Sequence, residues 1–185
     1  MVTFTSSGNS TANPFDFGSS STYASCGVKL TDGLTPDFTG TYGTSITLAI
    51  RAAAGAPDAG TSSYKGFVQT AGGSTTFTDA KSFSYPSFDA GYDSIEFDLP
   101  SEEIEDDGIV GITITDETDL DCQCWDNTNQ SGDYIPQRGN SSASMGNIRV
   151  GMTVTIVASA TAPASNITFP QIPESKYIKN SAFKS

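Results

Sequence analysis

Apolar and polar residues alternate along several short stretches of this chain, and that alternation constrains the fold more than any other feature. The clearest run is Ile95, Phe97 and Leu99, whose members are separated by single polar residues, and residues 110–115 and 148–158 repeat the pattern. Because successive side chains of a strand point to opposite faces, each run predicts a β-strand with one buried face. The run at 148–158 predicts the longest strand.

Weaker runs add further strands. Residues 66–70 and 75–78 flank a Gly-Gly pair, which predicts a hairpin. Residues 101–105 are expected to form one helical turn capped by Ser101. Seven or eight short strands with turns between them predict an all-β protein, an antiparallel β-sandwich that is jelly-roll-like. The expected strands are residues 26–30, 46–51, 66–70, 75–78, 83–85, 94–99, 110–115 and 148–158.

The two ends differ in composition from the middle. Residues 1–24 are low in complexity and rich in Ser and Thr, and residues 161–185 contain three prolines and isolated apolar residues. Such segments bury too little apolar surface to fold alone. We therefore expect an extended N-terminal arm (1–24), a β-sandwich domain (25–160) and an extended C-terminal arm (161–185). The alternative for the N-terminal segment is a flexible leader. The residues expected to anchor the C-terminal arm on other subunits are Phe169, Ile172, Lys176, Tyr177, Lys179 and Phe183.

Acidic residues are concentrated in one window. Fifteen of the twenty-one carboxylates lie in Asp89–Asp133, and no Lys or Arg occurs between Lys81 and Arg138. The net charge of −12 argues against nucleic acid as a partner, and against an anionic membrane surface. No stretch is long and apolar enough to span a membrane. The C-terminal segment has the opposite sign, with three Lys against a single Glu.

Histidine is absent, and its absence excludes several kinds of active site. A Ser-His-Asp triad, a Cys-His pair and any zinc site that needs imidazole are all ruled out. No phosphate-binding glycine loop is present either. Catalysis by two carboxylates stays open, but acid pairs in so acidic a window carry almost no specificity. We therefore predict that the protein is not an enzyme.

Residues 116–146 are expected to form the longest segment without regular structure, and such a loop is usually functional. Calcium binds several oxygen ligands from a flexible loop. Residues 127–133 match the start of an EF-hand loop in part, but Arg138 stands where the motif requires its last acid. The alternative is a solvated polar loop without a metal. The candidate calcium ligands are Asp116, Asp119, Asp121, Asp126 and Asp133.

Aromatic and amide side chains share this loop. An exposed aromatic ring beside amides can stack on a sugar, so the candidate ligand-binding residues are Trp125, Tyr134, Asn127 and Asn129. The alternative is that Trp125 plugs the end of the sandwich, because large aromatic residues are mostly buried.

The chain has three cysteines: Cys26, Cys122 and Cys124. We expect free thiols, as in proteins made in a cytoplasm. The alternative is a disulfide that joins Cys26 to one of the other two. A closed metal site would need about four ligands, and the chain has only these three cysteines and no histidine.

The composition is typical of proteins that act outside the cytoplasm, but the N-terminus has no secretory signal pattern. A virion component satisfies both observations, because it is made in the host cytoplasm and acts outside it. We therefore predict a non-enzymatic structural protein of a virus particle, from a bacteriophage: a capsid, decoration or tail component. Its expected partners are copies of itself and other virion proteins, contacted through the arms.

Two other functions stay open. The first is a carbohydrate-binding or adhesion module that uses the loop Asp116–Asp133 to bind a cell-surface glycan, with calcium as its cofactor. The second is a hydrolase that uses two carboxylates.

Overall fold

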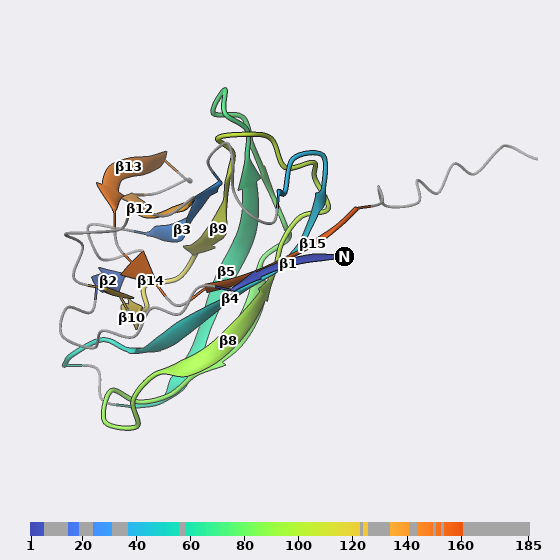
Figure 1. The fold of residues 1–185 in the computed structure, drawn as a ribbon. Coiled ribbons are helices and arrows are strands. Elements are labelled where there is room, and N and C mark those ends of the chain that lie inside the picture. Colours follow the sequence, from blue (N-terminus) through green and yellow to red (C-terminus); the bar gives the residue numbers. More distant parts are fainter. Residues whose placement is uncertain are drawn as a thin grey trace, which may run out of the picture.

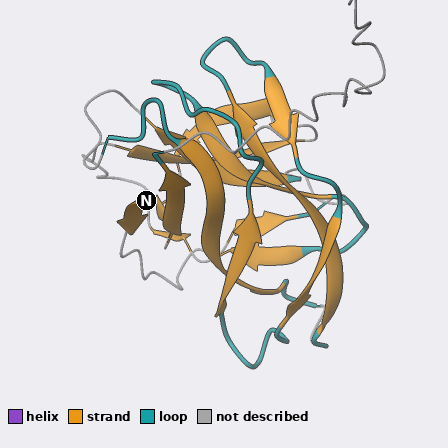
Figure 2. Ribbon diagram, turned by 90° about the vertical axis from the view of Figure 1, so that its right-hand side faces the viewer, coloured by secondary structure: helices purple, strands orange, loops and turns teal. Residues whose placement is uncertain are grey.

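The computed structural model describes most of the chain, and the described residues form only strands, turns and loops (Figures 1 and 2). The prediction of an all-β protein built from antiparallel sheets is therefore confirmed for these residues. None of them forms a helix that could cross a membrane. The described residues are 1–5, 15–18, 24–30, 37–55, 58–122, 124–125, 134–140, 144–149, 151–152 and 154–160.

Strand β4 is the centre of the first large sheet, sheet A. Residues 45–48 of β4 pair with β8 on one edge and with β15 on the other, and residues 50–52 pair with β10 beyond the end of β15. Strands β1 and β2 pair with β15 and β10 and form the margin of the sheet. The members are β1 (Val2–Thr5), β2 (Phe15–Phe17), β4 (Tyr42–Ala52), β8 (Asp93–Asp98), β10 (Leu120–Cys122) and β15 (Val154–Ser159).

Sheet B has the order β13-β12-β3-β9-β5, with β6 and β7 paired to different parts of β5. A two-stranded ribbon, β11 with β14, is not part of the hydrogen-bonded ladder of either sheet. The members of sheet B are β3 (Ser25–Leu30), β5 (Gly60–Gln69), β6 (Thr75–Phe77), β7 (Lys81–Tyr85), β9 (Ile109–Ile114), β12 (Tyr134–Asn140) and β13 (Ser144–Arg149), and the ribbon consists of β11 (Cys124–Trp125) and β14 (Gly151–Met152).

Eight of these strands pair in a nested order. In chain order they are β1, β3, β4, β5, β7, β8, β9 and β15, and the first pairs with the last, the second with the seventh, the third with the sixth and the fourth with the fifth. All four pairings are antiparallel, so the chain follows the path of one long hairpin folded over into two sheets. Strands β10 to β14 lie between β9 and β15 in the sequence and add to this nested set.

Both sheets contribute to a single apolar core. Ile46, Leu48 and Ile50 point inward from β4, and Val110 and Ile112 point inward from β9. The alternating apolar residues that predicted these strands thus point into the core, as expected. Three aromatic rings, from Tyr64, Phe83 and Phe97, meet edge to face with centroids 4.8–5.7 Å apart.

Both faces of β9 are buried, because a smaller cluster lies on the outer side of sheet B. Phe67 packs there against Ile109 and Phe77 and is fully buried. Its ring occupies the space that a Cβ at Gly111 would need, since that atom would lie 2.8 Å from the ring. Gly111 in turn stands opposite Gly27 of β3. At both glycines a Cβ would also lie 2.3 Å from a backbone carbonyl oxygen of the opposite strand, so the two glycines allow β3 and β9 to approach closely, and Gly111 in addition makes room for the Phe67 ring.

Three local expectations are wrong. The helical turn expected at residues 101–105 is absent, and Glu103 instead forms an isolated bridge with Tyr42. The backbone N–H of Ile104 donates to Thr41 O at 2.7 Å, and the Ile104 side chain is buried in the core. Burial of this one apolar residue outweighs the weak helical propensity of its neighbours.

The segment 116–146 is also not a continuous loop, because β10, β11, β12 and part of β13 lie within it. Likewise, the single strand expected at residues 148–158 is divided: Ile148 belongs to β13 of sheet B, and Val154–Ser159 forms β15 of sheet A. Alternation indicates a half-buried strand, but it does not reveal a change of sheet within one run.

Parts of the expected N-terminal arm lie on the body of the same chain. Val2–Thr5 and Phe15–Phe17 are strands of sheet A. Residues 6–14 and 19–23, like the whole expected C-terminal arm at 161–185, lie outside the described residues.

Gly66 of β5, in sheet B, lies close to the end of β8 in sheet A. A Cβ atom there would lie 1.9 Å from the carbonyl oxygen of Asp98 and 3.3 Å from Cα of Leu99. We expect Gly66→Ala to lower the free energy of unfolding by more than about 2 kcal/mol, because backbone must move to admit the methyl group. Urea denaturation measures this loss. Gly72→Ala is the control, since the nearest atom would lie 3.7 Å away; equal losses in the two variants would contradict the prediction.

Candidate functional site

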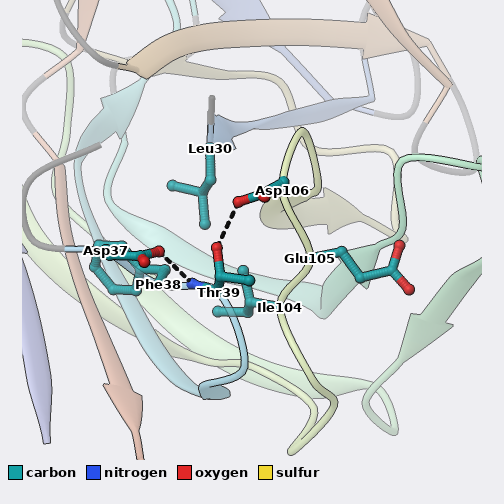
Figure 3. Close-up of a pocket in the computed structure, with 7 residues that line it drawn as sticks. All are labelled: Leu30, Asp37, Phe38, Thr39, Ile104, Glu105 and Asp106. Atoms are coloured by element: carbon teal, nitrogen blue, oxygen red, sulfur yellow. Dashed lines mark hydrogen bonds between the residues drawn. The ribbon is translucent and has the colours of Figure 1, made fainter. Parts of the chain in front are cut away.

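A small pocket opens beside the end of β3 (Figure 3). Its volume is about 10 Å³, which leaves room for about one water molecule. Two segments far apart in the sequence enclose it, the turn after residue 36 and the turn between β8 and β9. The lining residues are Leu30, Asp37, Phe38, Thr39, Ile104, Glu105 and Asp106.

Thr39 engages two of the three carboxylates in this pocket. Its backbone N–H donates to Asp37 Oδ1 at 2.8 Å, and its Oγ1 donates to Asp106 Oδ1 (Figure 3). The hydrogen bonds from Thr39, first of all the one from its backbone, lower the pKa of Asp37. The Glu105 carboxylate points away from Thr39 (Figure 3). The hydrogen bond between Thr39 and Asp106 thus joins the two turns. Among the described residues, no group of three or more His, Cys, Asp or Glu side chains is arranged to hold a metal ion.

Asp116, one of the candidate calcium ligands, anchors the turn that follows β9. It accepts hydrogen bonds from Ser62 Oγ at 2.7 Å, from the N–H of Ser63 at 2.5 Å and from the N–H of Thr118 at 3.2 Å. Burial raises the pKa of the Asp116 carboxyl, but these hydrogen bonds outweigh burial and the net pKa is lowered. The carboxylate therefore holds the turn against β5.

Asp121, a second candidate calcium ligand, is buried in β10 opposite Arg51 of β4. Arg51 Nε and Nη2 each lie 3.3 Å from Asp121 Oδ2, and the two side chains are only 14% and 1% exposed. The guanidinium also lies over the rings of Phe88 and Tyr92, 4.0 and 4.4 Å from their centroids. The ion pair thus lies on the outer face of sheet A, beneath the two rings of the loop that precedes β8.

Arg51, Phe88 and Tyr92 were not expected to interact. The one sequence feature that could have indicated this contact was a lone Arg on the non-core face of a strand, in a chain with few basic residues. The partner could not be deduced, because Arg51 and Asp121 are 70 residues apart.

The remaining candidates fall in several places. Asp119 accepts a backbone hydrogen bond from Ala53 N at 3.3 Å through its own carbonyl oxygen. Trp125 lies in β11 opposite Gly151, and Tyr134 lies in β12 opposite Leu30. Other candidates lie outside the described residues, so calcium and sugar binding by this segment stay predictions. Those candidates are Asp126, Asn127, Asn129, Asp133 and the six residues of the C-terminal arm.

The cysteines described in the structure belong to the core. Cys26 and Cys122 are fully buried, and Cys26 carries a free thiol. The expected free thiol is therefore confirmed for Cys26, and the alternative of a disulfide at this residue is not met.

Comparison with known proteins finds no family model, no curated protein and no solved structure that matches this chain. The functional proposal therefore rests on the chain's own geometry and charge.

The buried pair of Arg51 and Asp121 predicts a specific loss of stability. We expect Arg51→Met to lower the free energy of unfolding by about 3 kcal/mol, because it leaves a buried carboxylate facing an apolar side chain and removes the stacked cation. Guanidinium denaturation at neutral pH measures it. Lys81→Met is the control, since Lys81 and Asp98 are 46% and 57% exposed and their ion pair contributes little. A similar loss in both variants would contradict this prediction.

Asp116 predicts a pH dependence. Its pKa in the folded protein lies below the ordinary value of 3.8, so its stabilising contribution is present above that value and is lost as the pH falls through the folded pKa. We expect Asp116→Ala to be about 1–2 kcal/mol less stable than wild type at neutral pH, because hydrogen bonds to a charged acceptor are lost. The difference should shrink in urea titrations at acid pH. A difference that is the same at both pH values would show that the ionised carboxylate is not the cause.

Proposed function

We propose that this chain is a non-enzymatic structural protein of a virus particle, a capsid, decoration or tail component that assembles with copies of itself through its terminal segments. The observation that carries the proposal is the position of the two ends. Val2 of β1 is paired with Ala158 of β15, so β1 begins beside the end of β15 (Figure 1). The first strand and the last described strand therefore meet at one corner of sheet A.

The surface of the described body supports contacts of this kind. Met1, 85% exposed, is the one exposed large apolar residue among the residues whose side-chain exposure the structure describes. An apolar patch of the sort that joins obligate subunits is not found among these residues. We therefore propose contacts through charge, strand edges or the terminal segments.

The distribution of charge favours a head-to-tail contact. The charge of the acidic window is opposite in sign to that of the C-terminal segment. The C-terminal segment contains three basic residues, Lys176, Lys179 and Lys184, and one acidic residue, Glu174. Complementary charges on two surfaces of identical subunits bring those surfaces together and disfavour like-to-like contacts. We infer that the segment 161–185 is an arm that lies on the acidic body of a neighbouring copy.

The strand order adds to the proposal. We infer that the nested pairing of eight strands is a jelly roll in which residues 115–153 are an insertion before the last strand. Jelly rolls serve as viral capsid domains and also as lectins. Because one fold hosts many functions, this likeness supports the virus proposal without separating it from glycan binding.

Removal of the C-terminal segment tests the proposed function. We expect the full chain to form assemblies in light scattering and sedimentation, and a variant that ends at Ala160 to be folded, with the same melting temperature, but to lose the assemblies larger than a dimer. Replacing Lys176, Lys179 and Lys184 by Gln should weaken assembly, whereas replacing them by Arg, the control, should preserve it. A full chain that stays monomeric and binds glycans, with a melting temperature raised by calcium, would favour the carbohydrate-binding function instead.

A further inference from the structure

The two margins of sheet A differ in how their backbone groups are protected. Strands at the edge of a sheet expose unpaired N–H and C=O groups that can pair with another chain, and proteins usually block such edges with charges or side-chain caps. In sheet A, β8 forms one margin, and β1 with β2 forms the other.

The β8 margin is blocked. The N–H of Asp98 donates to Tyr64 Oη at 3.1 Å, and the N–H of Ser94 donates to Asp93 Oδ1 at 2.9 Å. Asp93, Glu96 and Asp98 are all exposed, and Lys81 Nζ lies 2.7 Å from Asp98 Oδ2. A second strand would meet capped donors and a row of carboxylates along this edge.

At the β1 margin, the described residues show neither form of protection. In the part of the chain that the structure describes, β1 pairs with β15 alone and ends the sheet. The first fifteen residues contain no charged side chain. Val2 packs against the core, Thr3 is exposed, and Met1 places the exposed apolar side chain beside this edge.

The other edges fit less well. β2 carries Asp16, β7 carries Lys81, and β13 carries Arg149. β6 is uncharged, but it is a three-residue strand that closes a hairpin with β5. β1, in contrast, is a four-residue edge strand without charged side chains, and it follows the exposed Met1.

We propose that the β1 edge binds the β1 edge of a second copy, antiparallel and about a twofold axis, so that sheet A continues from one subunit into the next. The net charge of −12 makes most approaches between identical subunits repulsive, and an uncharged edge is where two copies can meet. A twofold contact uses the same edge on both subunits, so the unpaired backbone groups of each satisfy those of the other. This inference rests on the proposed assembly function and names the contact within it.

A charge placed on the edge tests the proposal. We expect sedimentation equilibrium of the full chain in about 0.5 M salt, where charge contacts of the C-terminal segment are screened, to show a monomer–dimer equilibrium. Thr3→Asp should raise the dissociation constant tenfold or more, because two carboxylates would face each other across the axis. Thr76→Asp is the matched control, since Thr76 is an exposed threonine in the middle of the uncharged strand β6, and it should leave the dissociation constant unchanged.

Hydrogen exchange supplies a second readout. Amides of residues 2–5 should exchange more slowly at high protein concentration in the wild type, and the Thr3→Asp variant should lose this dependence on concentration. Wild-type assembly that Thr3→Asp leaves intact, or that Thr76→Asp weakens equally, would overturn the β1 contact while the proposed function stands. A wild-type chain that is monomeric at every concentration and salt would overturn the assembly function, and this contact with it.

Discussion

The backbone ladder of β4 supports the whole of sheet A. It pairs with β8 along one edge and with β15 and β10 in succession along the other, and its inward side chains are fully buried. Through β15 and β10 it also positions β1 and β2, which make no ladder with β4 themselves. The positions of β1 and β15 in the sheet therefore depend on β4 and on burial of its apolar face.

Carboxylates have two separate roles in the described structure. Asp116 and Asp121 serve the fold, the first by holding a turn on β5 and the second by pairing with Arg51 beneath two aromatic rings. Most other acids in the window are exposed, including Glu96, Glu102 and Glu105. An excess of exposed negative charge makes the approach of one acidic surface to another repulsive.

Strands with one buried face were predictable from local pattern. The runs at residues 26–30, 94–99 and 110–115 correspond to β3, β8 and β9 within one residue at each end, and the hairpin of β5 and β6 has the expected Gly-Gly turn. Strands held mainly by backbone pairing were not predictable. Residues 60–63 are small and polar, yet they belong to β5 because β7 pairs with them.

The candidate site was predictable only in kind. Composition indicated an acidic, histidine-free chain without a familiar catalytic constellation, because residue types alone decide which chemistry is possible. The tertiary structure decided which acid meets which partner, since Asp121 finds Arg51 across 70 residues and Asp106 finds Thr39 across 67. It also placed the first strand beside the last. Alternation depends on neighbours in the chain, whereas these contacts depend on how the long hairpin folds over, and no local pattern encodes that path.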